Sequence, residues 1–63
     1  MALKLKIRRI ELGKKQKDVA KEIGVSSQYL SNLENGFTKN PNLEIIKKLS
    51  KALNSTVEEL FFD

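Results

Sequence analysis

Apolar residues along this 63-residue chain recur every three or four positions, which is the spacing of one face of a helix. Alternation of polar and apolar residues is nowhere long enough to predict a strand. We therefore expect an all-α fold of five helices in one domain spanning residues 1–63. The expected helices cover about residues 3–12, 16–23, 27–35 and 43–53, with a short last helix that contains Val57, Leu60 and Phe61.

Start and stop signals support these boundaries. In the first predicted helix Leu3, Ile7 and Ile10 share one face, and Gly13 ends the helix. Asn42 is placed to cap the helix that contains Leu43, Ile46, Leu49 and Leu53. Thr56 and Glu59 have the spacing of a capping box, so a last helix is expected to begin there.

The segment from about residue 16 to residue 35 predicts two short helices joined by a tight turn. An apolar stripe of Val19, Ala20 and Ile23 gives the first helix its buried face. Gly24 supplies the backbone position at which this helix stops, and Ser26 or Ser27 caps the next one. Helices joined by so short a turn cross steeply, so the segment is predicted to be a helix-turn-helix.

The second helix of this pair is informative because of the side that it does not bury. Leu30 and Leu33 form its apolar side, whereas the other side carries small, uncharged polar residues: Ser27, Gln28, Ser31 and Asn32. A Gln or Asn amide donates and accepts in one plane, which matches the edge of adenine in the major groove of DNA. The alternative is an ordinary polar surface helix in a small bundle.

The chain resembles the phage repressor and Cro type of helix-turn-helix protein (the XRE family) over about residues 3 to 61. The motifs that carry the resemblance are Arg9-Ile10-Glu11-Leu12-Gly13, Gln16, Val19-Ala20, Gly24-Val25-Ser26, Leu33-Glu34-Asn35-Gly36 and Thr38-Lys39-Asn40-Pro41, followed by Leu49, Leu53, Val57 and Leu60. This resemblance implies a compact lambda-repressor-like fold. It also implies a transcriptional repressor that reads double-stranded DNA as a dimer on a palindromic operator.

The resemblance also assigns base-contacting positions. They fall near the start of the second helix of the pair, which is the part of such a helix that reads bases: Ser26, Ser27, Gln28 and Asn32. Gln28 is the strongest candidate because its amide bonds an adenine edge in two places. Ser27 departs from the longer amide common in close relatives. Tyr29 either contacts a thymine methyl or a phosphate, or is partly buried against the preceding helix.

Phosphate contacts are expected on both flanks of this helix. In the family the residue that matches Gln16 clamps a phosphate at the start of a helix, where backbone N–H groups favour an anion, and Lys15 would assist. The second flank corresponds to a loop that grips phosphates: Asn35, Thr38, Lys39 and Asn40. The alternatives are ordinary surface charge for Lys39 and a helix-end amide for Asn35. Arg9 and Glu34 match positions that the family pairs as a structural ion pair across the core.

The net charge of +4 is unevenly distributed. Residues 1–21 contain eight Lys or Arg side chains against Glu11 and Asp18, whereas the last twelve residues are acidic. Basic segments thus flank the predicted DNA-reading helix, which favours phosphate contact. A lysine-rich, solubilising surface is the alternative explanation.

Composition argues against catalysis and against cofactors. The chain has no cysteine and no histidine, so it lacks the usual metal ligands and the usual general base near neutral pH. Asp18 and Glu22 lie beside lysines and are expected to be a solvated surface pair. We expect no enzyme activity, no metal, no cofactor and no evident small-molecule effector. No segment approaches the roughly 20 apolar residues that span a membrane, so a cytoplasmic location is expected.

A dimer is expected because one DNA-reading helix covers only a few base pairs. The predicted interface is the C-terminal end, where Val57, Phe61 and Phe62 exceed what a short helix buries. The alternative is that both Phe side chains fold back into the monomer core, which applies above all to Phe61. The competing functional class is a protein-interaction module of the same fold, such as an antitoxin or an adaptor.

Overall fold

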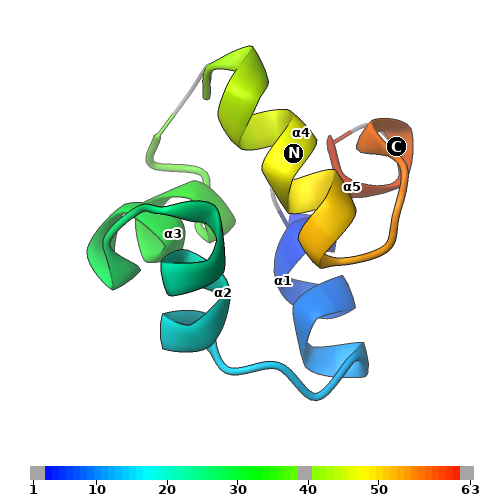
Figure 1. The fold of residues 1–63 in the computed structure, drawn as a ribbon, viewed down its shortest axis with the longest axis horizontal. Coiled ribbons are helices and arrows are strands. Elements are labelled where there is room, and N and C mark those ends of the chain that lie inside the picture. The colour runs from blue at the N-terminus through cyan, green and yellow to red at the C-terminus, as the bar shows by residue number, and fades with distance from the viewer. Residues whose placement is uncertain (1–2, 39–40, 62–63) are drawn as a thin grey trace.

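The computed structural model describes residues 3–38 and 41–61, which contain five helices and no strand (Figure 1). The helices are α1 (Leu3–Glu11), α2 (Gln16–Ile23), α3 (Ser27–Glu34), α4 (Leu43–Ala52) and α5 (Val57–Phe61). In Figure 1, α2 and α3 lie on one side of the molecule, α1 and α5 lie on the other, and α4 runs between them. The all-α prediction is confirmed, with helix ends within two residues of those expected.

One apolar core joins the five helices. Every helix contributes at least one side chain that is buried, and the core consists of Leu5, Val19, Ala20, Ile23, Leu30, Leu33, Leu49, Ala52, Leu53 and Leu60. The stripe predicted for α2 is therefore buried as expected, and so are the two leucines of α3. Burial of these side chains is the main favourable term in the folding of so small a domain.

Helix α1 does not bury the face that its apolar spacing indicates. Leu5 is fully buried, whereas Ile7 is 48% exposed and Ile10 is 57% exposed. The buried side of α1 runs through Leu5 to the nearly buried Arg9, four residues later, because this side faces α3 and α5. Ile7 and Ile10, which were expected to share one face, therefore do not form the buried side of α1. Leu43, at the start of α4, is also exposed.

Two of the tight helix ends depend on a left-handed residue. Gly24 has a φ of +80° and lets Val25 N–H donate to Ala20 O at 2.9 Å. Asn54 has the same role after α4, with a φ of +48°, and Ser55 N–H donates to Ser50 O at 3.0 Å. Asn is the side chain that tolerates this region best after glycine, which explains why α4 stops where the sequence predicted a break.

The predicted caps are present. Ser26 Oγ accepts from Tyr29 N–H at 3.0 Å, and Asn42 Oδ1 accepts from Ile45 N–H at 2.8 Å. The capping box is reciprocal: Thr56 Oγ1 accepts from Glu59 N–H at 3.0 Å, while Glu59 Oε1 accepts from Thr56 N–H at 2.7 Å. The hydrogen bond from the Thr56 backbone lowers the pKa of Glu59 below its ordinary value, with help from the Thr56 hydroxyl.

An ion pair links α1 to the end of α3. Arg9 Nε donates to Glu34 Oε2 at 2.7 Å and Arg9 Nη2 donates to Glu34 Oε1 at 3.2 Å, so the pair is bidentate. The Glu34 side chain is 2% exposed and that of Arg9 is 11% exposed. The third Arg9 nitrogen, Nη1, donates to Lys14 O at 2.9 Å. The structural pairing that the resemblance implied is therefore present and buried.

Replacing Glu34 by alanine should destabilise the fold by about 3–5 kcal/mol, because the buried Arg9 guanidinium would lose its counter-charge. Urea unfolding of Glu34→Ala measures this loss. The matched control is Glu44→Ala, which removes a 3.5 Å pair with Lys48 whose side chains are 73% and 48% exposed. That substitution should cost less than about 1 kcal/mol. Similar small losses for both variants would contradict a structural role for the buried pair.

The capping box should make stability depend on pH. Because the fold lowers the pKa of Glu59, its contribution is complete above the unfolded-state pKa and is lost as the pH falls through the folded-state value. Glu59→Gln keeps a capping side chain but does not titrate. Thermal melts from about pH 5 down to pH 3 should therefore fall more steeply for the wild type than for Glu59→Gln. Parallel curves would show that Glu59 does not carry the effect.

Candidate nucleic-acid interface

Helices α2 and α3 form the predicted helix-turn-helix. The turn consists of Gly24, Val25 and the N-cap Ser26, and α3 begins at Ser27. Leu30 and Leu33 hold α3 against the core, so the opposite side of this helix faces solvent. In Figure 1, α3 lies toward the opposite end of the molecule from α5.

The exposed side of α3 carries two linked amides. Gln28 Nε2 donates to Asn32 Oδ1 at 2.9 Å, and Gln28 is exposed while Asn32 is half-buried. An amide nitrogen has two N–H groups, so one N–H and the carbonyl oxygen of Gln28 are not used in this bond. The amide nitrogen of Asn32 is not used in it either. The bond links the two side chains on the outer face of α3.

The residues around this amide pair divide into exposed and structural side chains. Ser27 is exposed at the first position of α3. Ser26 uses its oxygen as the N-cap acceptor, although its hydroxyl hydrogen is still able to donate. Tyr29 is half-buried and packs against the core.

The start of α2 is held to the end of α3. Lys15 is the N-cap of α2, is exposed, and makes no capping hydrogen bond with its side chain. Gln16, at the first helical position, donates from Nε2 to Glu34 Oε1 at 3.2 Å. Sequence reasoning missed this bond because it joins positions that are 18 residues apart. The amide of Gln16 thus belongs to the same polar cluster as Arg9 and Glu34.

The other predicted flank follows α3 directly. The backbone folds back on Asn32, whose carbonyl accepts from Phe37 N–H at 2.8 Å and from Thr38 N–H at 3.2 Å. The Asn35 side chain donates to Ser31 Oγ at 3.4 Å, so its amide is engaged locally in the way that the helix-end alternative describes. The remaining two residues assigned to this flank, Lys39 and Asn40, lie outside the described residues.

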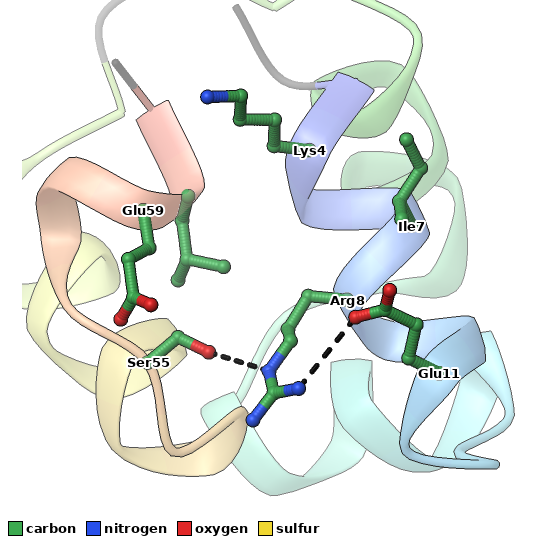
Figure 2. Close-up of a pocket in the computed structure, with 7 residues that line it drawn as sticks. Lys4, Ile7, Arg8, Glu11, Ser55 and Glu59 are labelled. Atoms are coloured by element: carbon green, nitrogen blue, oxygen red, sulfur yellow. Dashed lines mark hydrogen bonds and ion pairs between the residues drawn. The ribbon is translucent and has the colours of Figure 1, made fainter. Parts of the chain in front are cut away.

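Some basic side chains near the N-terminus have structural partners that the sequence did not indicate. Arg8 Nε donates to Ser55 Oγ at 2.7 Å and Arg8 Nη1 lies 3.5 Å from Glu11 Oε1. Figure 2 shows Arg8 between these two partners in an open pocket of about 290 Å³, whose other lining residues are Lys4, Ile7, Glu59 and Leu60. Lys14 Nζ donates to Ala52 O at 2.7 Å, at the end of α4.

The residues predicted to form a dimer interface lie at α5. Val57 and Phe61 are half-buried, and Phe61 packs against the core. Phe62 lies outside the described residues. Phe61 is therefore partly folded back into the monomer core, which is the alternative stated for it above. Beside α5, the exposed Ile7 of α1 lines a pocket with Leu60 and adds apolar surface that was not assigned to this region.

Within residues 3–38 and 41–61, no group of acidic, histidine or cysteine side chains is placed to hold a metal ion. Over the same residues, none of the helices has the length and apolar character needed to cross a membrane.

Comparisons with known proteins agree with this geometry. A helix-turn-helix family model (HTH_3) matches residues 5–60. The HTH-type transcriptional regulator SlrR of Bacillus subtilis (strain 168) is 44% identical over 43 residues, which are 68% of this chain and 28% of that relative. The chain thus spans less than a third of the length of this curated relative. No solved structure is a significant match. On the strength of the family match and of the α2–turn–α3 geometry, this chain belongs to the helix-turn-helix family.

Proposed function

We propose that this chain binds double-stranded DNA in a sequence-specific manner and regulates transcription as a repressor. The observation that carries the proposal is the linked pair of amides on the outer side of α3, the exposed Gln28 and the half-buried Asn32. The name of the similar protein, an HTH-type transcriptional regulator, supports the same function. We propose that the chain acts by binding and has no catalytic activity.

Base reading would begin with Gln28. Its carbonyl oxygen and its second N–H form the two-point contact that matches the N6 and N7 atoms of adenine. The bond to Asn32 would hold the Gln28 side chain in this orientation before DNA arrives, which lowers the cost of ordering it. Ser26, Ser27 and the amide nitrogen of Asn32 would contact neighbouring bases, while Tyr29 supports the helix from its half-buried side.

Phosphate contacts would fix the position of α3 in the groove. The first flank is the start of α2, where the exposed Lys15 and the Gln16 amide lie next to backbone N–H groups. The second flank is the segment after α3, with Asn35 and Thr38 followed by the two residues outside the description, Lys39 and Asn40. The start of α2 and Asn35 both lie at the end of the helix pair that is remote from the Gly24 turn, where Gln16 contacts Glu34.

A two-fold dimer would double the sequence that is read. Along the longest dimension of 25 Å, α3 lies toward one end and α5 toward the other (Figure 1). Two copies that meet at α5 would place their α3 helices at opposite ends, with a separation comparable to the roughly 34–36 Å between successive major grooves. The proposed interface contains Val57, Phe61 and Phe62, and the operator is proposed to be palindromic.

The first experiment is a gel shift with random duplex DNA at low salt, followed by selection of bound sequences from a random pool. We expect salt-sensitive binding and a palindromic motif. A chain that binds no duplex at all would instead be a protein-interaction module of this fold.

Replacing Gln28 by alanine should cost about 1–3 kcal/mol on the selected site and relax the base preference at one position of each half-site. Fluorescence anisotropy on the selected and scrambled duplexes measures both effects. Lys15→Ala and Lys39→Ala are the controls: each should weaken all sequences similarly and make the plot of log affinity against log salt shallower by about one. Equal losses on both duplexes for Gln28→Ala would reject its role as a base reader.

Replacing Phe62 by aspartate should weaken cooperative binding to the full palindrome, because a charge would enter the proposed apolar interface. Affinity for an isolated half-site should stay nearly constant, and this affinity also controls for the added negative charge. Sedimentation of the complex gives its stoichiometry. Unchanged binding to the palindrome, with one copy per site, would reject the dimer.

A further inference from the structure

The Gln16 amide lies between a buried carboxylate and the proposed phosphate-binding end of α2. Its Nε2 donates to Glu34 Oε1 at 3.2 Å, and the Gln16 side chain is half-buried. An ionised carboxylate only accepts hydrogen bonds, so Glu34 determines which end of the amide faces inward. The nitrogen points toward Glu34, and the carbonyl oxygen is directed elsewhere.

This orientation leaves the second N–H of Gln16 Nε2 for another acceptor. Gln16 is the first residue of α2, and the cap before it, Lys15, contributes no side-chain acceptor to the end of the helix. An amide in the reverse orientation would present its oxygen to the carboxylate, and two acceptors would then face each other. The bond to Glu34 therefore determines that an anion at the start of α2 would meet an N–H of Gln16.

We propose that Glu34 is a positioning residue for DNA binding: its buried carboxylate holds the Gln16 amide so that Nε2 bridges two anions, donating one N–H to Glu34 and the other to a DNA phosphate. This inference rests on the proposed function, since it needs DNA at the start of α2. It assigns to Glu34 a role beyond the ion pair.

Arg9 makes this arrangement electrostatically possible. A carboxylate one side chain away from a phosphate would repel it, but Glu34 is neutralised by the bidentate Arg9 at 2.7 and 3.2 Å. Arg9 also holds Lys14 O at 2.9 Å, two residues before Gln16. The same cluster thus fixes the backbone that leads into α2 and the side chain that starts it.

A double-mutant cycle with Gln16→Ala and Glu34→Gln tests the proposal through affinity for duplex DNA. Gln16→Ala should weaken specific and random duplexes by a similar factor of about ten, the size of one hydrogen bond to a charged group. Glu34→Gln should cause most of that loss, because its new amide nitrogen would face the Gln16 donor. The double variant should bind no more weakly than Gln16→Ala alone.

Two controls separate positioning from mere stability. Circular dichroism melts set an assay temperature at which every variant is folded. Lys15→Ala should make the salt dependence shallower by about one, whereas Gln16→Ala removes a neutral group and should leave the slope unchanged. Losses that multiply in the double variant would overturn the proposal. A wild type that binds no duplex would instead reject the proposed function.

A measurement on the wild type keeps the test decisive if Glu34→Gln does not fold. The two Nε2 protons of Gln16 give separate NMR signals in a ¹⁵N-labelled sample. On titration with duplex, the proton directed away from Glu34 should move downfield while the proton directed toward Glu34 keeps its shift. Loss of the Glu34-bonded shift in the complex would show that DNA breaks the bridge, and would overturn the proposal.

Discussion

The buried carboxylate of Glu34 is the constraint on which the arrangement of the helices depends. A charge that is 2% exposed is costly unless it is paired and hydrogen-bonded, and Glu34 meets this requirement with donors from Arg9 and Gln16. Its partners come from α1 and α2, and Glu34 itself is the last residue of α3. Any displacement of one helix would leave a buried charge unsatisfied, so this single group fixes three helices at one point.

The helix-turn-helix is thus held at both ends by different physical means. At the closed end the left-handed Gly24 sets the turn, a local backbone effect. At the open end, where α2 begins and α3 stops, the two helices are held together by the polar contact between Gln16 and Glu34, which are far apart in the sequence. Between these ends, Leu30 and Leu33 anchor α3 by burial, which leaves its outer amides in a defined orientation toward solvent.

Local features were predictable from the sequence and tertiary ones were not. The caps at Ser26 and Asn42 were predicted because their partners lie three residues away. The buried side of α1 was not predictable in this way, because Leu5 lies between lysines in the sequence and only packing against α3 and α5 selects it over Ile7. The outer face of α3 followed from its leucines, but the bond from Gln16 to Glu34 depends on how the helices cross.

Several of the basic side chains in the N-terminal third of the chain make contacts that stabilise the fold. Arg8, Arg9 and Lys14 each pair with a carboxylate, that of Glu11, Glu34 and Glu22 respectively, so part of the positive charge in the sequence is already offset within the fold. Among the described lysines, Lys15 and Lys17 are exposed on the first turn of α2 or beside it. These two lysines add positive charge where the Gln16 amide and the helix N-terminus already favour an anion. The fold thus pairs three cations of the N-terminal third with carboxylates and leaves two exposed lysines at the helix start where a phosphate is proposed to bind.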